Sequence, residues 1–265
     1  MIIFTPLSAF LKDISLSMEG IEYQDRGKNY EEKGHWWYVG RKKILLQLIN
    51  FFFRKRPLKI LDVGCGTGEM MKALSVFGDV KGVEIYKPLV EYSKAIGLDV
   101  SEGGIGELPF NEKFDIVTLL DVLEHIEDDS IVKNLSNYLK PDGLLFITVP
   151  ALPLLWGPSD IYSKHYRRYC RNDLKKKLEK FGFDVQKISY FNSLLFPLIF
   201  FTKLFLRMYS KILRIKPSDS DLRILFFKPI NFICKKLLES EAWCLKYFNF
   251  PIGTSLIAVV KNKSF

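Results

Sequence analysis

The stretch ILDVGCGTG, residues 60–68, decides how this 265-residue chain folds. An apolar run ends in an acidic residue, and a ladder of glycines follows at Gly64, Gly66 and Gly68. A helical pattern starts at Glu69, so the segment predicts a buried strand, a tight turn and a helix. Glycines let a ligand approach the main chain closely, and the first turn of a helix presents free N–H groups to that ligand.

A carboxylate follows the glycine ladder at a distance that suits a nucleoside. Glu84 lies twenty positions after Gly64, at the end of a second short apolar stretch, where a carboxylate suits two neighbouring ribose hydroxyls. A dinucleotide fingerprint has the spacing G-x-G-x-x-G, whereas the third glycine here comes one residue earlier. The spacing therefore favours a nucleoside ligand and disfavours a nicotinamide-dependent oxidoreductase.

Strand and helix patterns alternate through most of the chain, and a further helix begins near Trp36 and ends before Pro57. The predicted strands are 58–63, 80–84, 98–101, 114–120, 143–149 and 183–190, and the predicted helices are 69–77, 87–96, 130–139 and 171–181. Pro141-Asp142-Gly143 predicts a turn. This alternation predicts a doubly wound α/β fold, with a parallel sheet covered by helices on both faces.

LDVGCGTG (61–68) resembles the first motif of the class I S-adenosylmethionine-dependent methyltransferases. The similarity continues through GVEIYKPLVEYSKAIGLDV (82–100), GELPF (106–110), FDIVTLLDVLEHIED (114–128) and LLFITVP (144–150). The resemblance covers about residues 35–190 and 253–262. It implies a mostly parallel, seven-stranded Rossmann-like sheet whose last strand, Ser255–Val260, is antiparallel, and it implies S-adenosylmethionine as the cofactor.

The resemblance also divides the chain into parts. We expect an N-terminal helical cap (1–56), a cofactor-binding core (57–190), a helical insertion (191–252), and the last core strand with a tail (253–265). Members of the family usually join the last two strands by a short turn, so the insertion is the main departure from the family pattern.

The resemblance places the cofactor site around the glycine ladder. It assigns cofactor contacts to Asp62, Gly64, Cys65, Gly66, Gly68, Glu84, Ile85, Ile105 and Asp121. Glu84 would hold the ribose hydroxyls, Asp62 would orient the loop or meet the amino group, and Asp121 would lie near the sulfonium. Gly104 stands where relatives often carry an acid for the adenine amine, so the backbone near Ile105, or Glu102, would replace that acid.

The predicted catalytic residues are His125, Asp121 and His165. Transfer to an oxygen requires a base, and His125 is the first choice because it follows the fourth strand. The predicted substrate-binding residues are Trp36, Trp37, His165, Tyr166, Arg167 and Arg168. The arginine forks suit an anionic group, or else belong to a solvated basic loop. The tryptophans form either a lid or ordinary core packing.

The C-terminal third carries the whole excess of positive charge. Residues 186–265 hold 13 Lys and Arg against 4 Asp and Glu, a net charge of +9, whereas residues 1–185 hold 26 of each. The apolar runs 194–201 and 224–238 are too short to span a bilayer, and their lysines and aromatic residues suit helices that lie on an anionic membrane. A homodimer surface and a lid over the sheet are the alternatives. Nucleic-acid binding is disfavoured, because large aliphatic residues interrupt the basic ones.

The cysteines at positions 65, 170, 234 and 244 lack C-x-x-C spacing, so we expect reduced thiols and no bound metal. Residues 1–13, MIIFTPLSAFLKD, do not have the pattern of a signal peptide. These features predict a cytoplasmic methyltransferase, which lies on the inner face of the membrane if the insertion docks there. It would methylate oxygen on a small or lipid-linked acceptor, such as a sugar, a quinone-like ring or a polyisoprenoid-linked molecule. The alternative is a cofactor-binding sensor or scaffold without transfer activity.

Overall fold

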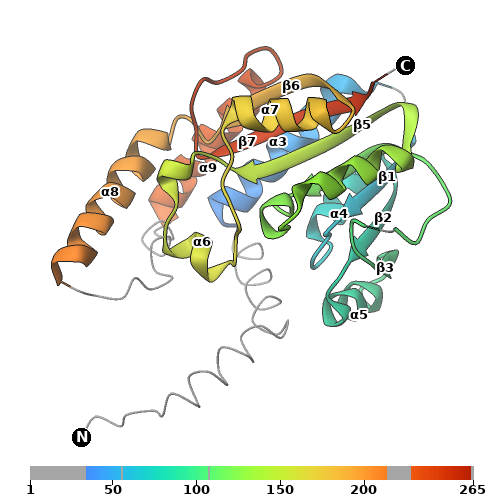
Figure 1. Cartoon of the computed structure of the whole chain (residues 1–265), viewed down its shortest axis with the longest axis horizontal. Coiled ribbons are helices and arrows are strands. Elements are labelled where there is room, and N and C mark those ends of the chain that lie inside the picture. Colours follow the sequence, from blue (N-terminus) through green and yellow to red (C-terminus); the bar gives the residue numbers. More distant parts are fainter. Residues whose placement is uncertain (1–33, 55, 107, 214–227, 264–265) are drawn as a thin grey trace, which may run out of the picture.

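A seven-stranded sheet with the order β3-β2-β1-β4-β5-β7-β6 forms the centre of the computed structural model (Figure 1). The structure describes residues 34–54, 56–106, 108–213 and 228–263, so the predictions made for residues 1–33 lie outside it. The strands are β1 (Leu58–Val63), β2 (Gly78–Glu84), β3 (Val100–Glu102), β4 (Phe114–Leu120), β5 (Leu139–Pro150), β6 (Phe183–Phe191) and β7 (Ser255–Asn262). Strands β1 to β5 pair in parallel, and β7 runs antiparallel to β5 and β6. The predicted fold class is confirmed.

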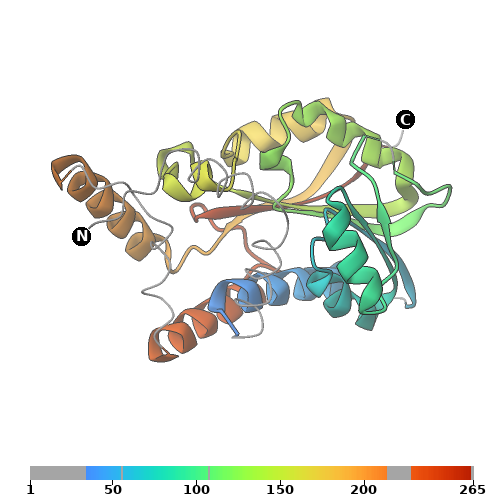
Figure 2. The ribbon, with the colours of Figure 1, turned by 90° about the horizontal axis from the view of Figure 1, so that it is seen from below.

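Helices cover both faces of the sheet (Figure 2). Helices α3 (Trp36–Phe52) and α9 (Lys228–Cys244) bury one face, and α7 (Arg171–Lys180) with the 3-10 segment Asp129–Tyr138 buries the other. The central strands β1 and β4 are almost continuously apolar, as expected for strands enclosed between two helical layers. The shorter helices are α4 (Glu69–Leu74), α5 (Lys87–Ala95) and α6 (Pro158–Tyr162).

Two local predictions differ from the structure. The segment expected as an α-helix at 130–139 is a 3-10 helix, and its buried residues Asp129, Val132 and Leu135 recur every third position, which matches three residues per turn. The turn predicted at Pro141-Asp142-Gly143 lies inside β5 as an irregularity, because the pairing with β4 jumps from Leu139 to Leu144. Because β5 pairs with β4 on both sides of the irregularity, Leu139–Pro150 forms one long strand where a break was predicted.

The two helices of the insertion have different surroundings. Helix α9 packs so tightly on α3 that a Cβ on Gly40 would lie 2.2 Å from Leu238 Cδ2. Helix α8 (Phe196–Leu213) instead extends away from the sheet, at the left of Figures 1 and 2. Its Lys203 Nζ donates to Leu155 O at 3.1 Å, which ties α8 to the loop after β5. Among the described helices, none combines the length and apolar character needed to cross a bilayer.

Candidate active site

The glycine loop after β1 has one packed side and one open side. Gly64, Gly66 and Gly68 have φ values of 75°, 55° and 77°, the left-handed region that favours glycine. A Cβ on Gly64 would stand 2.5 Å from Val122 Cγ2, so the loop lies directly against the segment that follows β4. A Cβ on Gly66 would meet no atom within 4 Å. The open side at Gly66 therefore leaves room for a ligand against the main chain.

Glu84 ends β2 beside this open side. Its Oε2 accepts a hydrogen bond from Gly66 N and its Oε1 accepts one from Tyr86 N, both at 2.9 Å. Each oxygen keeps further acceptor capacity, so the oriented carboxylate fits a pair of neighbouring hydroxyls. Ile85 is 76% exposed, and its Cδ1 would lie 3.7 Å from a Cβ on Gly104. These residues fit a nucleoside with an apolar wall for its base.

Three other predicted cofactor residues are buried. Asp62 accepts a hydrogen bond from Thr118 Oγ1 at 2.6 Å, and burial raises the pKa of its carboxyl to about 6, although Thr118 and Arg41 oppose the shift. Burial also raises the pKa of the Cys65 thiol, which makes it a poor nucleophile. The side chain of Ile105 belongs to the hydrophobic core, so only its backbone is available to a ligand.

Asp121 lies at the carboxyl end of β4 with a φ of 56°, which is uncommon outside glycine and often marks functional sites. Thr148 Oγ1 donates to its Oδ1 at 3.0 Å, and Arg41 of α3 forms an ion pair with its Oδ2. Arg41 was not among the residues predicted from the sequence. Its only signal is a charged residue in a mostly apolar helix, and the partner is eighty positions away.

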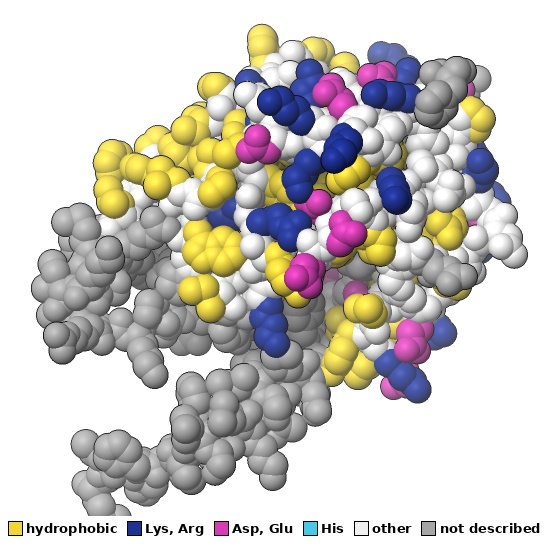
Figure 3. All heavy atoms as spheres, in the orientation of Figure 1, with side chains coloured by type: hydrophobic (Ala, Val, Ile, Leu, Met, Phe, Trp, Pro, Cys, Tyr) yellow, Lys and Arg dark blue, Asp and Glu magenta, His cyan; other side chains and the backbone are white. Residues whose placement is uncertain are grey.

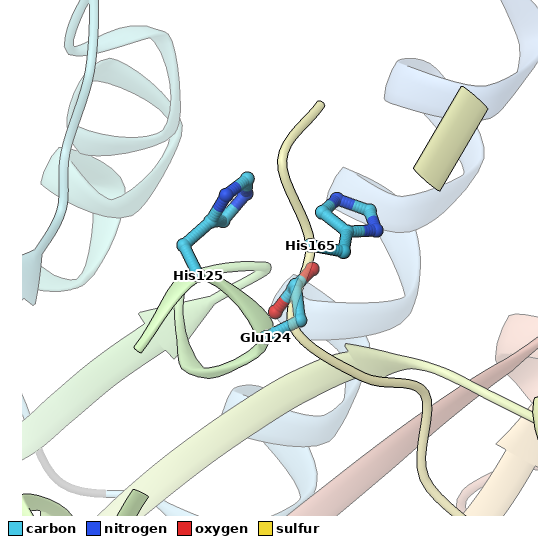
Figure 4. Close-up of side chains that lie close together, drawn as sticks. All are labelled: Glu124, His125 and His165. Atoms are coloured by element: carbon cyan, nitrogen blue, oxygen red, sulfur yellow. The ribbon is translucent and has the colours of Figure 1, made fainter. Parts of the chain in front are cut away.

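His125 and His165 meet although they come from different loops (Figure 4). Their ring centroids are 4.7 Å apart in an edge-to-face arrangement, and Glu124 lies next to them. The His125 side chain is exposed at the surface, and desolvation by the protein around it together with the neighbouring His165 lowers its pKa to about 4. The third histidine, His35, lies apart from this pair, buried at the start of α3, where its Nδ1 accepts from Trp37 N at 3.3 Å.

Asp160 organises the loop after β5 and was not predicted. It is fully buried and accepts hydrogen bonds from Gly157 N at 2.8 Å and Arg168 Nε at 2.7 Å, and it bonds His165 Nδ1 at 3.0 Å. Burial alone would raise the pKa of Asp160, but the bonds with His165 and Arg168 outweigh burial and lower it to about 2. Asp160 therefore holds both side chains in place as a carboxylate.

A pocket of about 350 Å³ lies next to this network and is lined by Pro153, Trp156, Tyr166, Arg167 and Arg168. Three of the predicted substrate-binding residues thus share one pocket. Both arginines also have internal partners: Arg168 bonds Asp160 and Ala151, and Arg167 pairs with Asp129 at 3.2 Å. Trp156 was not predicted, since a single tryptophan in a loop gives no sequence signal.

The two predicted tryptophans lie elsewhere. Trp36 is 2% exposed within the hydrophobic cluster between α3, α9 and the sheet. Trp37 stacks on Phe191, with ring centroids 5.7 Å apart and planes inclined by 10°. These positions favour the core-packing alternative for the tryptophans over a substrate lid.

Known methyltransferases are similar to this chain in sequence. Residues 36–188 match a family model described as a methyltransferase domain. The chain is 30% identical over 152 residues to the ubiquinone biosynthesis O-methyltransferase of Coxiella burnetii strain RSA 331, a match that covers 51% of this chain and 65% of the relative. The chain therefore spans less than two thirds of that relative's length.

Two solved structures share the fold. A TehB-like S-adenosylmethionine-dependent methyltransferase from Corynebacterium glutamicum aligns with a TM-score of 0.56 at 18% identity, covering 92% of this chain and 98% of that chain. Phosphoethanolamine N-methyltransferase 2 from Haemonchus contortus, in complex with S-adenosyl-L-methionine, aligns with a TM-score of 0.55 at 16% identity, covering 83% and 52%. At these identities the likeness concerns the fold.

Proposed function

The chain belongs to the class I S-adenosylmethionine-dependent methyltransferases, and from that premise we propose that it methylates a hydroxyl oxygen on a small, largely apolar acceptor. The contact between Gly64 and Val122 carries this proposal. Val122 follows Asp121 directly and precedes His125 by three residues, so this contact supports a base close to the cofactor site. Ligands of open α/β sheets bind at this carboxyl edge.

The residues around the glycine loop would hold the cofactor. Glu84 would accept hydrogen bonds from the ribose hydroxyls, Ile85 would flank the adenine, and the open main chain at Gly66 would contact the methionine part. Asp62 and Asp121 supply negative charge for its cationic groups. When bound, S-adenosylmethionine supplies an electrophilic methyl group on a sulfonium.

The histidine pair favours an oxygen acceptor. With its pKa lowered to about 4, the His125 ring is neutral at pH 7 and can accept a proton, but the same shift makes it a weaker base than an ordinary histidine, so its contribution would come from its position. A hydroxyl loses its proton as its oxygen bonds the methyl carbon, and a positioned base contributes about 10²–10⁴ to the rate of such a step. The bond to Asp160 makes His165 a positioning residue for its neighbour. The Coxiella relative is an O-methyltransferase by name, which also supports oxygen.

The pocket beside His165 would hold the acceptor. Trp156 and Pro153 give it apolar walls, which suit a ring or an isoprenoid chain. Arg167 and Arg168 lie at the same pocket with their internal partners already in place, so their remaining N–H groups suit a carboxylate or phosphate. This combination favours an amphiphilic acceptor, such as a quinone-like ring or a lipid-linked molecule, over a free sugar.

The surface around the pocket supports a lipid-linked acceptor. Leu154 and Ile161 near the pocket are 66% and 67% exposed, and Leu198 and Phe201 on α8 are 55% and 65% exposed. Figure 3 shows hydrophobic side chains gathered toward the α8 side of the molecule, with lysines and arginines on the adjoining surface. Apolar side chains bordered by basic ones suit an anionic membrane surface. We therefore propose that the membrane contacts the surface formed by Leu154, Ile161, Leu198 and Phe201.

A transfer assay with tritiated S-adenosylmethionine tests the reaction. The acceptors are a prenylated dihydroxybenzoate, its short-chain analogue, a soluble hexose and ethanolamine phosphate. We expect labelled ether product with the two phenols and none with the amine. Labelling of the amine alone would contradict the oxygen assignment. Cofactor binding without transfer to any acceptor would favour a sensor or scaffold.

Liposome flotation tests the membrane contact. Wild type should float with vesicles of phosphatidylglycerol at low salt, less so at high salt, and not with neutral vesicles. The double variant Leu198→Asp and Phe201→Asp should lose flotation. Phe232→Asp is the matched control, because Phe232 is 60% exposed on α9. Equal loss in the control variant would move the contact to α9.

A further inference from the structure

Three side chains near the histidine pair have the composition of a metal site. Glu124, His125 and His165 each offer a ligand atom, and these atoms all lie within 4.8 Å of one another. Figure 4 shows the two rings on either side of the Glu124 carboxylate. Glu124 and His125 belong to the short turn after β4, and His165 comes from the loop after β5. No other such group occurs within the described ranges of the chain.

Glu124 gives a second, independent indication of a missing ligand. Its side chain is buried, with 1% of the residue exposed, and its Oε2 has no hydrogen-bond partner among the residues that the structure describes. A buried carboxylate oxygen without a partner carries a large desolvation cost, which a proton or a cation would relieve. The negative charge of Asp121 adds to this cost, whereas the positive charges of Arg41 and Arg168 offset part of it.

The surrounding contacts prepare the rings to act as ligands. Asp160 bonds Nδ1 of His165, which leaves Nε2 of that ring for another partner. A carboxylate on the second ring nitrogen is the usual outer contact of a metal-binding histidine, because it fixes the ring and makes its free nitrogen more basic. His125 is fixed through the backbone of Ser163. Both rings thus have an anchoring contact outside the cluster.

We propose that Glu124, His125 and His165 bind one divalent first-row transition metal ion, such as Zn²⁺, Mn²⁺ or Fe²⁺. Two imidazoles and one carboxylate suit these ions, whereas Mg²⁺ and Ca²⁺ prefer oxygen ligands alone. Metal–ligand bonds are about 2.0–2.2 Å long, so the three side chains would close by roughly 1 Å around the ion. The sequence expectation of no metal relied on cysteine spacing, which does not detect ligands from two separate loops.

The ion would change how the acceptor is activated, a consequence that rests on the proposed function. Three protein ligands leave positions open for a hydroxyl of the acceptor. A cation there stabilises the oxyanion, so the hydroxyl proton leaves to water and His125 serves as a ligand in place of a base. The oxygen then bonds the methyl carbon as the carbon–sulfur bond breaks, and that electron pair stays on sulfur. No oxidant or further reactant is needed.

Titration of the metal-free full-length protein with CoCl₂ tests the site, because bound Co²⁺ absorbs visible light. We expect one Co²⁺ per chain and at least tenfold weaker binding in Glu124→Gln and His165→Asn. Glu127→Gln, an exposed carboxylate three residues away, should bind Co²⁺ like wild type. Circular dichroism and S-adenosylmethionine affinity, both measured on every variant, identify any variant that is misfolded.

Each result decides between the two proposals. Absence of stoichiometric Co²⁺ binding, or equal affinity in wild type and both ligand variants, would overturn the metal site. If transfer to phenols survives complete removal of the metal, the proposed role of the metal in transfer is overturned and the proposed function remains intact. Tight Co²⁺ binding with no transfer to any phenol would keep the site and refute the proposed function.

Discussion

The proposed cofactor side and the proposed acceptor side of this enzyme are held by different kinds of contact. Beside β1 and β2, the site is held mainly by backbone groups. The N–H groups of Gly66 and Tyr86 donate hydrogen bonds to the Glu84 carboxylate. Beyond β4 and β5, buried carboxylates hold the loops, as in the pairs of Asp160 with Arg168 and of Asp129 with Arg167. A site held by backbone groups can be predicted from the local sequence. A site held by charges that lie far apart in the sequence depends on the whole fold.

This difference predicts two kinds of failure. Removing a carboxylate on the cofactor side removes contacts to a ligand and leaves the local backbone pairing of β1 and β2 in place. Removing one on the acceptor side leaves a buried cation without its carboxylate, which destabilises the folded protein itself. If mutations on the two sides have the same consequence, the two sides are not held in different ways.

Asp160→Ala should have the largest effect, and on stability. Arg168 is 8% exposed and would lose the carboxylate that it contacts at 2.7 Å. Breaking a buried ion pair costs about 3–5 kcal/mol, which urea unfolding followed by circular dichroism would measure. Asp142→Ala, on the exposed irregularity of β5, should change the free energy of unfolding by less than about 0.5 kcal/mol.

Acid provides a second measurement of the same contact. The pKa of Asp160 lies below its ordinary value, at about 2, so its ionised form contributes stability at neutral pH, and that contribution disappears as pH falls from about 4 towards 2. The contribution is about 2 kcal/mol. Wild type should lose this part of its stability in that range, and Asp160→Ala should not. Parallel pH curves for the two proteins would contradict the assignment.

Glu84→Ala should have the next largest effect, and on cofactor binding. Hydrogen bonds to a charged group contribute about 1.5–3 kcal/mol each, so loss of two ribose contacts predicts an affinity at least about 100-fold lower. Isothermal titration calorimetry with S-adenosylmethionine measures this change. Glu91→Ala, an exposed carboxylate on α5, is the control and should bind normally. Unchanged affinity in Glu84→Ala would refute the placement of the cofactor.

The pH dependence of cofactor affinity should show an intermediate effect that comes from Asp62. Burial raises its pKa to about 6, so the carboxylate that would attract the cofactor's amino group is present above pH 6 and is lost as pH falls below it. Affinity should fall about tenfold between pH 7 and pH 5, since each unit below the pKa reduces the ionised fraction about tenfold. Asp62→Asn should show a flat profile, and a pH dependence that persists in this variant would exclude Asp62 as its source.

The sequence predicted the fold around the glycine ladder well because its signals are local. The strand, the glycine ladder and Glu84 lie within 27 consecutive residues, 58–84, and the structure confirms the strand, the turn and the helix at those positions. The parallel sheet followed from the alternation of strand and helix patterns, and the antiparallel last strand followed from the family resemblance. The turn signal Pro141-Asp142-Gly143 coincides with the irregularity in β5, but it does not predict that pairing with β4 resumes at Leu144 and continues the same strand.

The acceptor side was predicted only in part. The segment 163–169 was identified, but its arginines are engaged with Asp160 and Asp129, contacts that no spacing rule reveals. The approach of His165 to His125 depends on two loops that the sheet topology brings together. Insertion 191–252 was treated as one unit, yet α9 belongs to the core and α8 stands away from it. Each of these features requires the whole fold.

Lys203→Ala should have the smallest effect, and it tests whether α8 serves the acceptor side alone. The bond from Lys203 Nζ to Leu155 O contributes about 1 kcal/mol, so its loss should raise the KM for the acceptor about two- to fivefold through a looser pocket rim. S-adenosylmethionine affinity should not change, because α8 does not contribute any residue assigned to the cofactor site. Lys236→Ala, an exposed position on α9, is the control. An altered cofactor affinity in Lys203→Ala, with a normal KM for the acceptor, would show that α8 acts on the other side of the molecule.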